Sequence, residues 1–243
     1  NLFSAYEFSA VVILTDKHFL KLDEFSSHIF TNALSVSLDF IKRVYGARPE
    51  CKHAVIGMGY LPTSGSSIIH PHFQLYLSRI PFHYLNYMLK RSDKYFEQNS
   101  ANYWKELVEV EKEAGKRYVG RIGNVEWLTT FAPMGFNEVQ GLICDKSNFL
   151  EFNDGDLKGI SEGLSRILRF YKQELKLTSF NLAIYSGPLG EKREDFWASI
   201  KIISRPNFRA NYINDTWFGP KLLLDSWSPF LPEMLARSLS KYF

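Results

Sequence analysis

The sequence has 243 residues, of which 45% are hydrophobic and 23% charged, so it can bury a core as one large domain or two small ones. The formal net charge is only +3 and no dense run of Lys and Arg occurs, which argues against a nucleic-acid partner. No apolar run approaches the roughly 20 residues that span a bilayer, and no basic-then-apolar leader is present, so we expect no membrane partner.

The first half of the chain predicts strands around one helix, then a polar helical segment. In chain order these are a strand over 9–14, a helix over 27–45, a strand starting at 54–56, a Gly/Ser/Pro loop over 57–67 and a strand over 72–77. Residues 84–115 are rich in Lys and Glu and predict helix, as an insertion or connector. The half therefore predicts strand, helix, strand, strand.

The second half repeats this order. It predicts a strand over 138–143, a helix over 154–175 and strands over 180–185 and 197–204. An offset of 127 residues lays 73–78 on 200–205, and a similar offset aligns the helices. We therefore predict a duplicated α+β protein, with halves at 1–120 and 121–243 and with two sheets that are joined or packed together.

The two cysteines, Cys51 and Cys144, lie far apart and form neither a disulfide framework nor a metal knuckle. A reducing, cytoplasmic location fits this usage best. The chain begins with Asn1 rather than Met. We leave open that residues precede it.

Two of the six histidines stand at i and i+2 on a predicted strand, so their side chains share a face. These are His70 and His72, with Gln74 next on that face. They follow Gly65-Ser66-Ser67, whose backbone N–H groups could approach a phosphate closely. A neutral imidazole can attack phosphorus and form a covalent intermediate. A His-x-His pair alone is more often structural than catalytic, so the whole string carries the hypothesis.

That string resembles the motif of the galactose-1-phosphate uridylyltransferase family, in the histidine-triad superfamily. The resemblance covers most of the chain, and residues 126–145 look like the strand pair that opens the family's second half. It implies duplicated histidine-triad-like units, with a mainly antiparallel sheet and flanking helices. The family pattern Gly-x-Ser-x-x-His-Pro-His-x-Gln is matched by Gly65, Ser67, His70, Pro71, His72 and Gln74, and its Asp-x-His by Asp16-Lys17-His18.

The resemblance implies a role for each matched residue. His72 would carry the uridylyl or adenylyl group, while Gln74 and the 65–67 turn, through Gly65, Ser66 and Ser67, would hold the transferred phosphoryl group. His18 and His70 would be two ligands of a structural zinc. The family takes two further ligands from an upstream Cys-x-x-Cys that this sequence lacks, so the zinc is absent or its other ligands precede Asn1. No organic cofactor is implied.

Three departures from the family pattern affect the substrate prediction. Gly59 stands where the family has an Asn that touches the nucleotide phosphates. Trp197 and Ser199 occupy the positions of a second-half His-x-His metal site, so we expect that second metal site to be lost. The family's nucleotide-base pocket draws on an N-terminal stretch that this sequence does not contain.

The resulting hypothesis is transfer of a nucleoside monophosphate between a nucleoside diphosphate sugar and a sugar 1-phosphate, through a nucleotidyl-histidine at His72. Two alternatives stay open. The same histidine could serve a nucleotide hydrolase or phosphorylase, or the protein could be a non-catalytic nucleotide-binding relative. A homodimer is expected from the resemblance alone.

Overall fold

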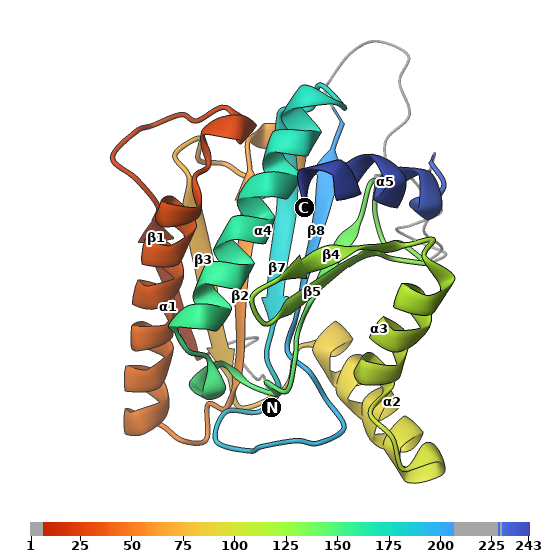
Figure 1. The fold of residues 1–243 in the computed structure, drawn as a ribbon. Helices are drawn as coiled ribbons and strands as arrows, with labels where there is room; N and C mark the ends of the chain where they lie inside the picture. The colour runs from red at the N-terminus through yellow and green to blue at the C-terminus, as the bar shows by residue number, and fades with distance from the viewer. Residues whose placement is uncertain (1–6, 207–227, 229) are drawn as a thin grey trace.

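One eight-stranded sheet runs through the whole molecule (Figure 1). The computed structural model describes residues 7–206, 228 and 230–243. Every neighbouring pair in the sheet is antiparallel, in the order β1-β3-β2-β7-β8-β6-β5-β4. The strands are β1 Phe8–Ile13, β2 His53–Tyr60, β3 His72–Ser78, β4 Tyr118–Ile122, β5 Val125–Thr129, β6 Val139–Ile143, β7 Ser179–Tyr185 and β8 Ser199–Arg205.

The strand order contains the predicted repeat. β1-β3-β2 in the first half is mirrored by β6-β8-β7 in the second, and the two sets join where β2 pairs with β7. The helices α1 (Ser27–Ala47) and α4 (Asp154–Gln173) follow β1 and β6. The α+β class and the antiparallel sheet are thus confirmed, and the two expected sheets are one. The predicted division after residue 120 falls inside β4 and stays a prediction.

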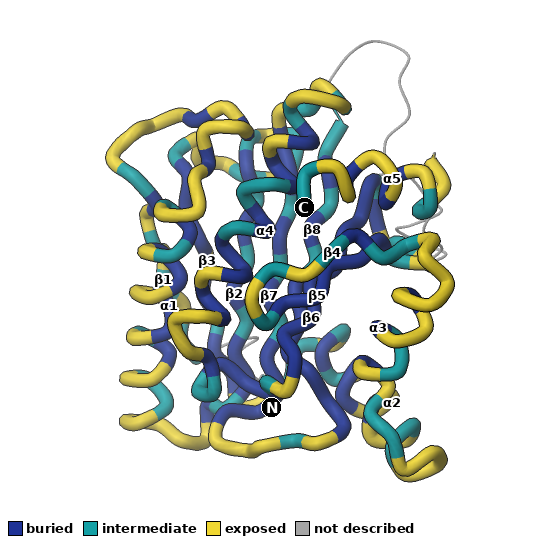
Figure 2. Tube along the Cα trace, in the orientation of Figure 1, coloured by how far each residue is buried: buried dark blue, intermediate teal, exposed yellow. Residues whose placement is uncertain are grey.

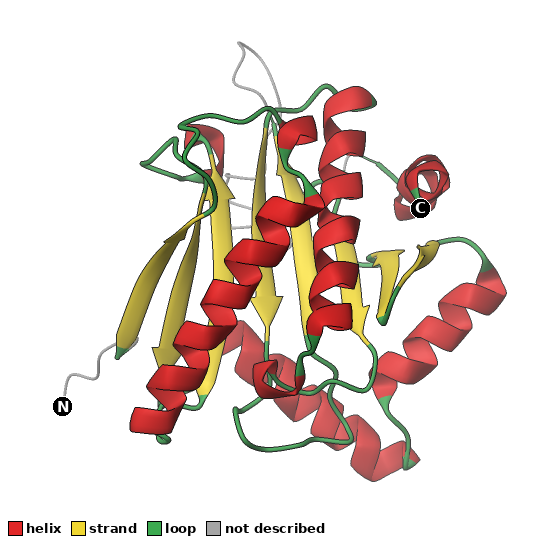
Figure 3. Ribbon diagram, turned by 60° about the vertical axis from the view of Figure 1, so that its left-hand side comes forward, coloured by secondary structure: helices red, strands yellow, loops and turns green. Residues whose placement is uncertain are grey.

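α1 and α4 cover one face of the sheet (Figure 3). Each begins at a side-chain cap: Ser26 Oγ accepts from Ile29 N, and Asn153 Oδ1 accepts from Asp156 N. The strands alternate, so that Phe73, for example, is fully buried against this layer. The main core therefore lies between the sheet and these two helices, and it includes residues from both halves.

A smaller core lies on the opposite face, under the helices α2 (His83–Asn99) and α3 (Tyr103–Ala114). This hairpin is the predicted helical insertion. Trp104 of α3 packs there with Leu128 and Leu142 of the sheet and with Phe196. Figure 2 shows the outer turns of both helices exposed, in contrast to the strands beneath them. The fifth helix, α5 (Pro232–Leu239), packs near β4 and β5. Within the described residues no helix combines the length and apolar content needed to cross a bilayer.

The sequence prediction of a loop from residue 57 was wrong for four residues. β2 continues to Tyr60, because Met58 and Tyr60 alternate into the main core and are 3% and 1% exposed. The intervening Gly57 and Gly59 lie on the opposite face, where a glycine leaves the sheet surface low.

Candidate functional site

The histidine motif lies on the face of the sheet opposite α1 and α4. His72 is the first residue of β3, and Gln74 follows it on the same face. β3 lies between β1 and β2, so Pro71 stands at the strand entry and not at a sheet edge. His72 is 5% exposed, whereas Ile13, its partner on β1, is 53% exposed and Gln74 is exposed. His72 thus lies low between accessible neighbours.

One hydrogen bond determines which nitrogen of the neutral His72 ring carries the proton. Nδ1 lies 2.7 Å from the backbone oxygen of His70. A carbonyl oxygen only accepts, so Nδ1 must carry the proton and donate. In the neutral ring Nε2 then holds the lone pair, and no described residue hydrogen-bonds to it. This tautomer is the one that a nucleophile attacking through Nε2 requires.

A row of cross-strand neighbours with small residues in its middle, which we call the trough, crosses the sheet from Gln74 to the second half. Cross-strand pairing sets Gln74 beside Gly57, Gly57 beside Ala183, and Ala183 beside Lys201. Residues directly opposite each other on paired strands share a face. Because the two middle positions carry no side chain or one methyl group, the surface between Gln74 and Lys201 is low. No described residue hydrogen-bonds to the Gln74 amide, which leaves it available to a ligand.

The predicted phosphate loop follows β2 and returns toward His72. Residues Pro62–Ser64 form one turn of 3₁₀ helix, and Gly65 closes it with φ +84°, a conformation that favours glycine. The Ser66 hydroxyl donates to the backbone oxygen of Ile68, 2.7 Å away, so it is used within the loop. Ser67 is exposed and forms no hydrogen bond to the described residues. Of the two serines, Ser67 is the one with a hydroxyl free for a phosphate.

Two side chains from the second half hold this loop. Asn181 Nδ2 on β7 donates to the backbone oxygen of Ser64 at 2.9 Å, and Arg205 Nε at the end of β8 donates to that of Thr63 at 3.0 Å. The loop enters at Leu61, whose φ of 67° and ψ of 164° form a combination nearly exclusive to glycine. The surrounding hydrogen bonds maintain this strained conformation.

The same close packing accounts for Gly59, where the family pattern has Asn. A Cβ atom at this position would lie 3.0 Å from Ser64 Oγ and 3.3 Å from Asn181 Nδ2. The second-half Asn181 therefore occupies the space into which a side chain at residue 59 would project. The chain has an asparagine beside the loop, but from another strand.

His18 and His70, the two zinc ligands that the resemblance implies, lie close together. Their ring centroids are 4.9 Å apart in an edge-to-face arrangement. His70 Nε2 is engaged with the backbone oxygen of Thr15 at 2.6 Å. Across residues 7–206, 228 and 230–243, no cluster of three or more His, Cys, Asp or Glu side chains could hold a metal ion. Two ligands do not satisfy the four-coordinate geometry of structural zinc.

The far end of the trough contains a buried ion pair that the motif analysis did not include. Lys201 Nζ lies 2.7 Å from Glu138 Oε1, and Glu138 also accepts from Thr130 Oγ1 and Met134 N. Burial alone would lower the pKa of Lys201, but Glu138 and Tyr84 together outweigh it, so that the pKa is raised. The sequence held a signal for Lys201, because the repeat offset of 127 carries Gln74 onto residue 201.

The sequence matches an uncharacterized protein of the archaeon Archaeoglobus fulgidus. The two are 36% identical in an alignment 242 residues long, which covers 98% of this chain and 70% of the archaeal one. The chain belongs to the same family as this archaeal protein. No protein-family model matches the sequence.

Solved structures show the same fold at low sequence identity. A uridylyltransferase superposes with a TM-score of 0.84 and 16% identity, covering 96% of this chain and 74% of its own. An ADP-glucose phosphorylase from Arabidopsis thaliana superposes with a TM-score of 0.79 at 15% identity, covering 96% of this chain and 72% of its own. A GalT-like protein from the same plant superposes with a TM-score of 0.80 at 16% identity, covering 99% of this chain and 81% of its own. The resemblance drawn from the histidine motif is thus confirmed for the fold.

Proposed function

We propose that the protein is a nucleotidyltransferase that moves a nucleoside monophosphate from a nucleoside diphosphate sugar to a sugar 1-phosphate, with His72 as the nucleophile. The hydrogen bond from His72 Nδ1 to the His70 backbone oxygen carries this proposal. It leaves the lone pair of the neutral ring on Nε2, on the face of the sheet where Gln74 is exposed. The shared fold with a uridylyltransferase and a sugar-nucleotide phosphorylase supports the same class of reaction.

The first half-reaction breaks the bond between the α-phosphorus and the bridging oxygen of the substrate. Nε2 of His72 attacks that phosphorus, an N–P bond forms, and the sugar 1-phosphate leaves with the electron pair of the broken bond. The ring becomes positively charged while Nδ1–H stays bonded to the carbonyl, which stabilises that charge. The Gln74 amide and Ser67 hydroxyl would donate to the non-bridging phosphoryl oxygens.

The second half-reaction returns the histidine to its starting state. A phosphate oxygen of an incoming sugar 1-phosphate attacks the phosphorus, and the N–P bond breaks with its electron pair returning to Nε2. The imidazole is again neutral with its proton on Nδ1. Dividing the transfer in this way replaces one difficult displacement between two anions with two steps, one in which the neutral imidazole attacks and one in which it leaves.

Labelling tests the nucleophile directly. The protein is incubated with UDP-glucose or ADP-glucose labelled in the α-phosphate, and an acid-labile protein adduct is measured. The wild type should acquire close to one label per chain, His72→Gln none, and the control His28→Gln, an exposed helix histidine, as much as the wild type. No adduct on the wild type, or equal labelling of His72→Gln, would refute the proposal and favour a non-catalytic binding protein.

The acceptor separates this proposal from its nearest alternative. A phosphorylase or hydrolase would use the same adduct but deliver it to inorganic phosphate or water, and the shared fold with an ADP-glucose phosphorylase gives that alternative its support. Isolated adduct is chased with galactose 1-phosphate, glucose 1-phosphate or inorganic phosphate. We expect release as a nucleoside diphosphate sugar. Release as a nucleoside diphosphate only, or as the monophosphate in every chase, would reassign the reaction.

A further inference from the structure

A cavity lies along α2, away from the histidine motif. Its volume is about 460 Å³, and it is lined by α2 and by the first residues of α3. Aromatic rings form much of its wall: Tyr87 and Tyr95 from α2 and Tyr103 and Trp104 from α3. Tyr87 is 53% exposed and Tyr103 39%, although aromatic rings usually stabilise a protein by being buried. Exposed aromatic rings that line a cavity are a common feature of ligand-binding sites.

The aromatic wall is held in a fixed arrangement. The Tyr95 and Tyr103 rings meet edge to face at 5.3 Å, as do those of Tyr103 and Trp104. The Trp104 indole N–H donates to Ser92 Oγ at 3.0 Å, and the Tyr95 hydroxyl donates to Glu106. A wall that is ordered before a ligand arrives loses little conformational freedom on binding.

The charge of the cavity is positive. Arg91 and Lys94 line it, both exposed, and none of the described residues that line it is acidic. The Arg91 guanidinium stacks over the Tyr87 ring, 5.0 Å from its centroid. A cation held against an exposed ring face offers both a phosphate contact and a stacking surface in one place.

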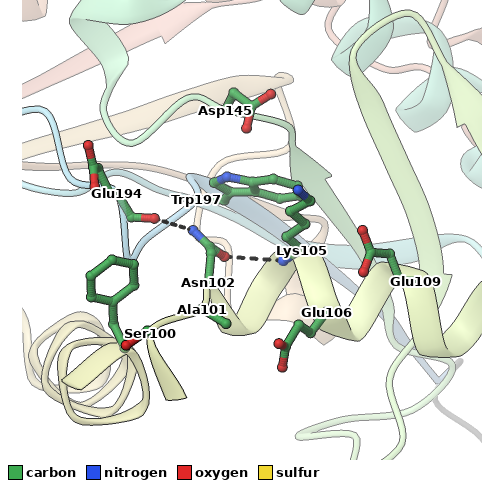
Figure 4. A pocket seen from close by; sticks show the side chains of 10 residues that line it. Ser100, Ala101, Asn102, Lys105, Glu106, Glu109, Asp145, Glu194 and Trp197 are labelled. Atoms are coloured by element: carbon green, nitrogen blue, oxygen red, sulfur yellow. Dashed lines mark hydrogen bonds between the residues drawn. The ribbon is translucent and has the colours of Figure 1, made fainter. Parts of the chain in front are cut away.

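A neighbouring cavity shows the opposite character. A hollow of about 410 Å³ has Glu106, Glu109, Asp145 and Glu194 in its lining, with a single cation, Lys105 (Figure 4). Four carboxylates around one ammonium repel a phosphate. The contrast shows that the positive charge of the cavity along α2 is local, because the same hairpin also lines an acidic hollow.

From the ring wall and the two cations we propose that the cavity between α2 and the start of α3 is a second binding site, for a nucleotide. The base would stack on the exposed faces of Tyr87 and Tyr103, and the phosphate would bind Arg91 and Lys94. No residue of the His72 site lines this cavity. The two sites are connected through Tyr84, which lines the cavity and whose ring lies 5.5 Å from Lys201 at the end of the trough.

Calorimetric titration tests the site. AMP, UMP, glucose 1-phosphate and inorganic phosphate are titrated into the wild type, Tyr87→Ala, Arg91→Met and Lys90→Met. Lys90 lies on the same helix but lines a different cavity, so its variant is the matched control. We expect Arg91→Met and Tyr87→Ala each to weaken nucleotide binding about tenfold or more, with Lys90→Met unchanged. Both changed side chains are exposed, so folding should not be affected.

The outcome is separable from the reaction proposed for His72. Nucleotide binding at this cavity should persist in His72→Gln, and Arg91→Met should still form the covalent adduct if the wild type does. Binding that is lost in His72→Gln and unaffected by Arg91→Met would place the nucleotide in the first site alone and overturn this inference. Equal affinity for glucose 1-phosphate and nucleotides, or no nucleotide binding at all, would overturn it as well.

Discussion

His53 is a buried residue whose environment makes folding depend on pH. It opens β2, is 6% exposed, and its Nδ1 has no hydrogen-bond partner among the described residues. Burial, with a smaller contribution from the charge of Lys52, lowers the pKa of His53 to about 4, although Glu191 opposes it. The unfolded chain, with a pKa near 6.5 at this residue, therefore binds a proton first as the pH falls. The folded state loses stability between pH 6.5 and 4.

We expect this single histidine to lower the unfolding free energy by about 2 kcal/mol between pH 7 and pH 5. The loss is about 1.4 kcal/mol per pH unit, and it acts over about 1.5 pH units, from the unfolded-state pKa near 6.5 down to pH 5. Urea unfolding of the wild type and of His53→Gln at both pH values measures it. The wild type should lose about that much more than the variant on acidification. Equal losses in the two proteins would mean that the pKa of His53 is the same in the folded and the unfolded chain.

At the scale of elements, β2 and the turn after it show how one strand position controls the phosphate loop. Gly59→Asn restores the residue type of the family pattern, but its Cβ would press on Ser64 Oγ and Asn181 Nδ2. We expect a loss of about 1–3 kcal/mol in unfolding free energy and a slower adduct formation, because the loop must shift. Gly46→Asn, on the last turn of α1 where nothing lies within 4 Å of an added Cβ, is the control. A Gly59→Asn protein as stable as this control would show that the loop can shift to accommodate the asparagine without a loss of stability.

The same region shows what the sequence could and could not predict. The alternation through β3 placed His72 and Gln74 on one face from local periodicity alone, and the structure agrees. The sequence predicts a loop at Gly57 and Gly59, because glycine is depleted in strands. The residue that favours glycine at position 59 lies far away in the sequence. Asn181, more than 100 residues away, packs against Gly59. Strand pairing of this range leaves no local signal, and the β2–β7 junction was therefore beyond sequence reasoning.

At the scale of the molecule, the two halves share one sheet and one main core. β2 pairs with β7 over six residue pairs, and Phe25 of the first half meets Phe180 of the second edge to face at 5.8 Å. Each half would expose a strand edge and part of this core if the other unfolded. Neither half is therefore expected to be stable while the other is unfolded. We expect the chain to unfold in one cooperative step despite its duplicated sequence.

The two cysteines report on this cooperativity, since one lies in each half. Cys51 is fully buried in the main core and Cys144, 9% exposed, lies in the smaller core under α2 and α3. Burial raises the pKa of both thiols, that of Cys144 to about 11, so neither should react with a thiol reagent while folded. In a urea series with brief labelling, both thiols should become reactive at the same midpoint, with Cys51→Ala and Cys144→Ala assigning the signals. A Cys144 midpoint well below that of Cys51 would show that the second half, or the helical hairpin over it, opens on its own.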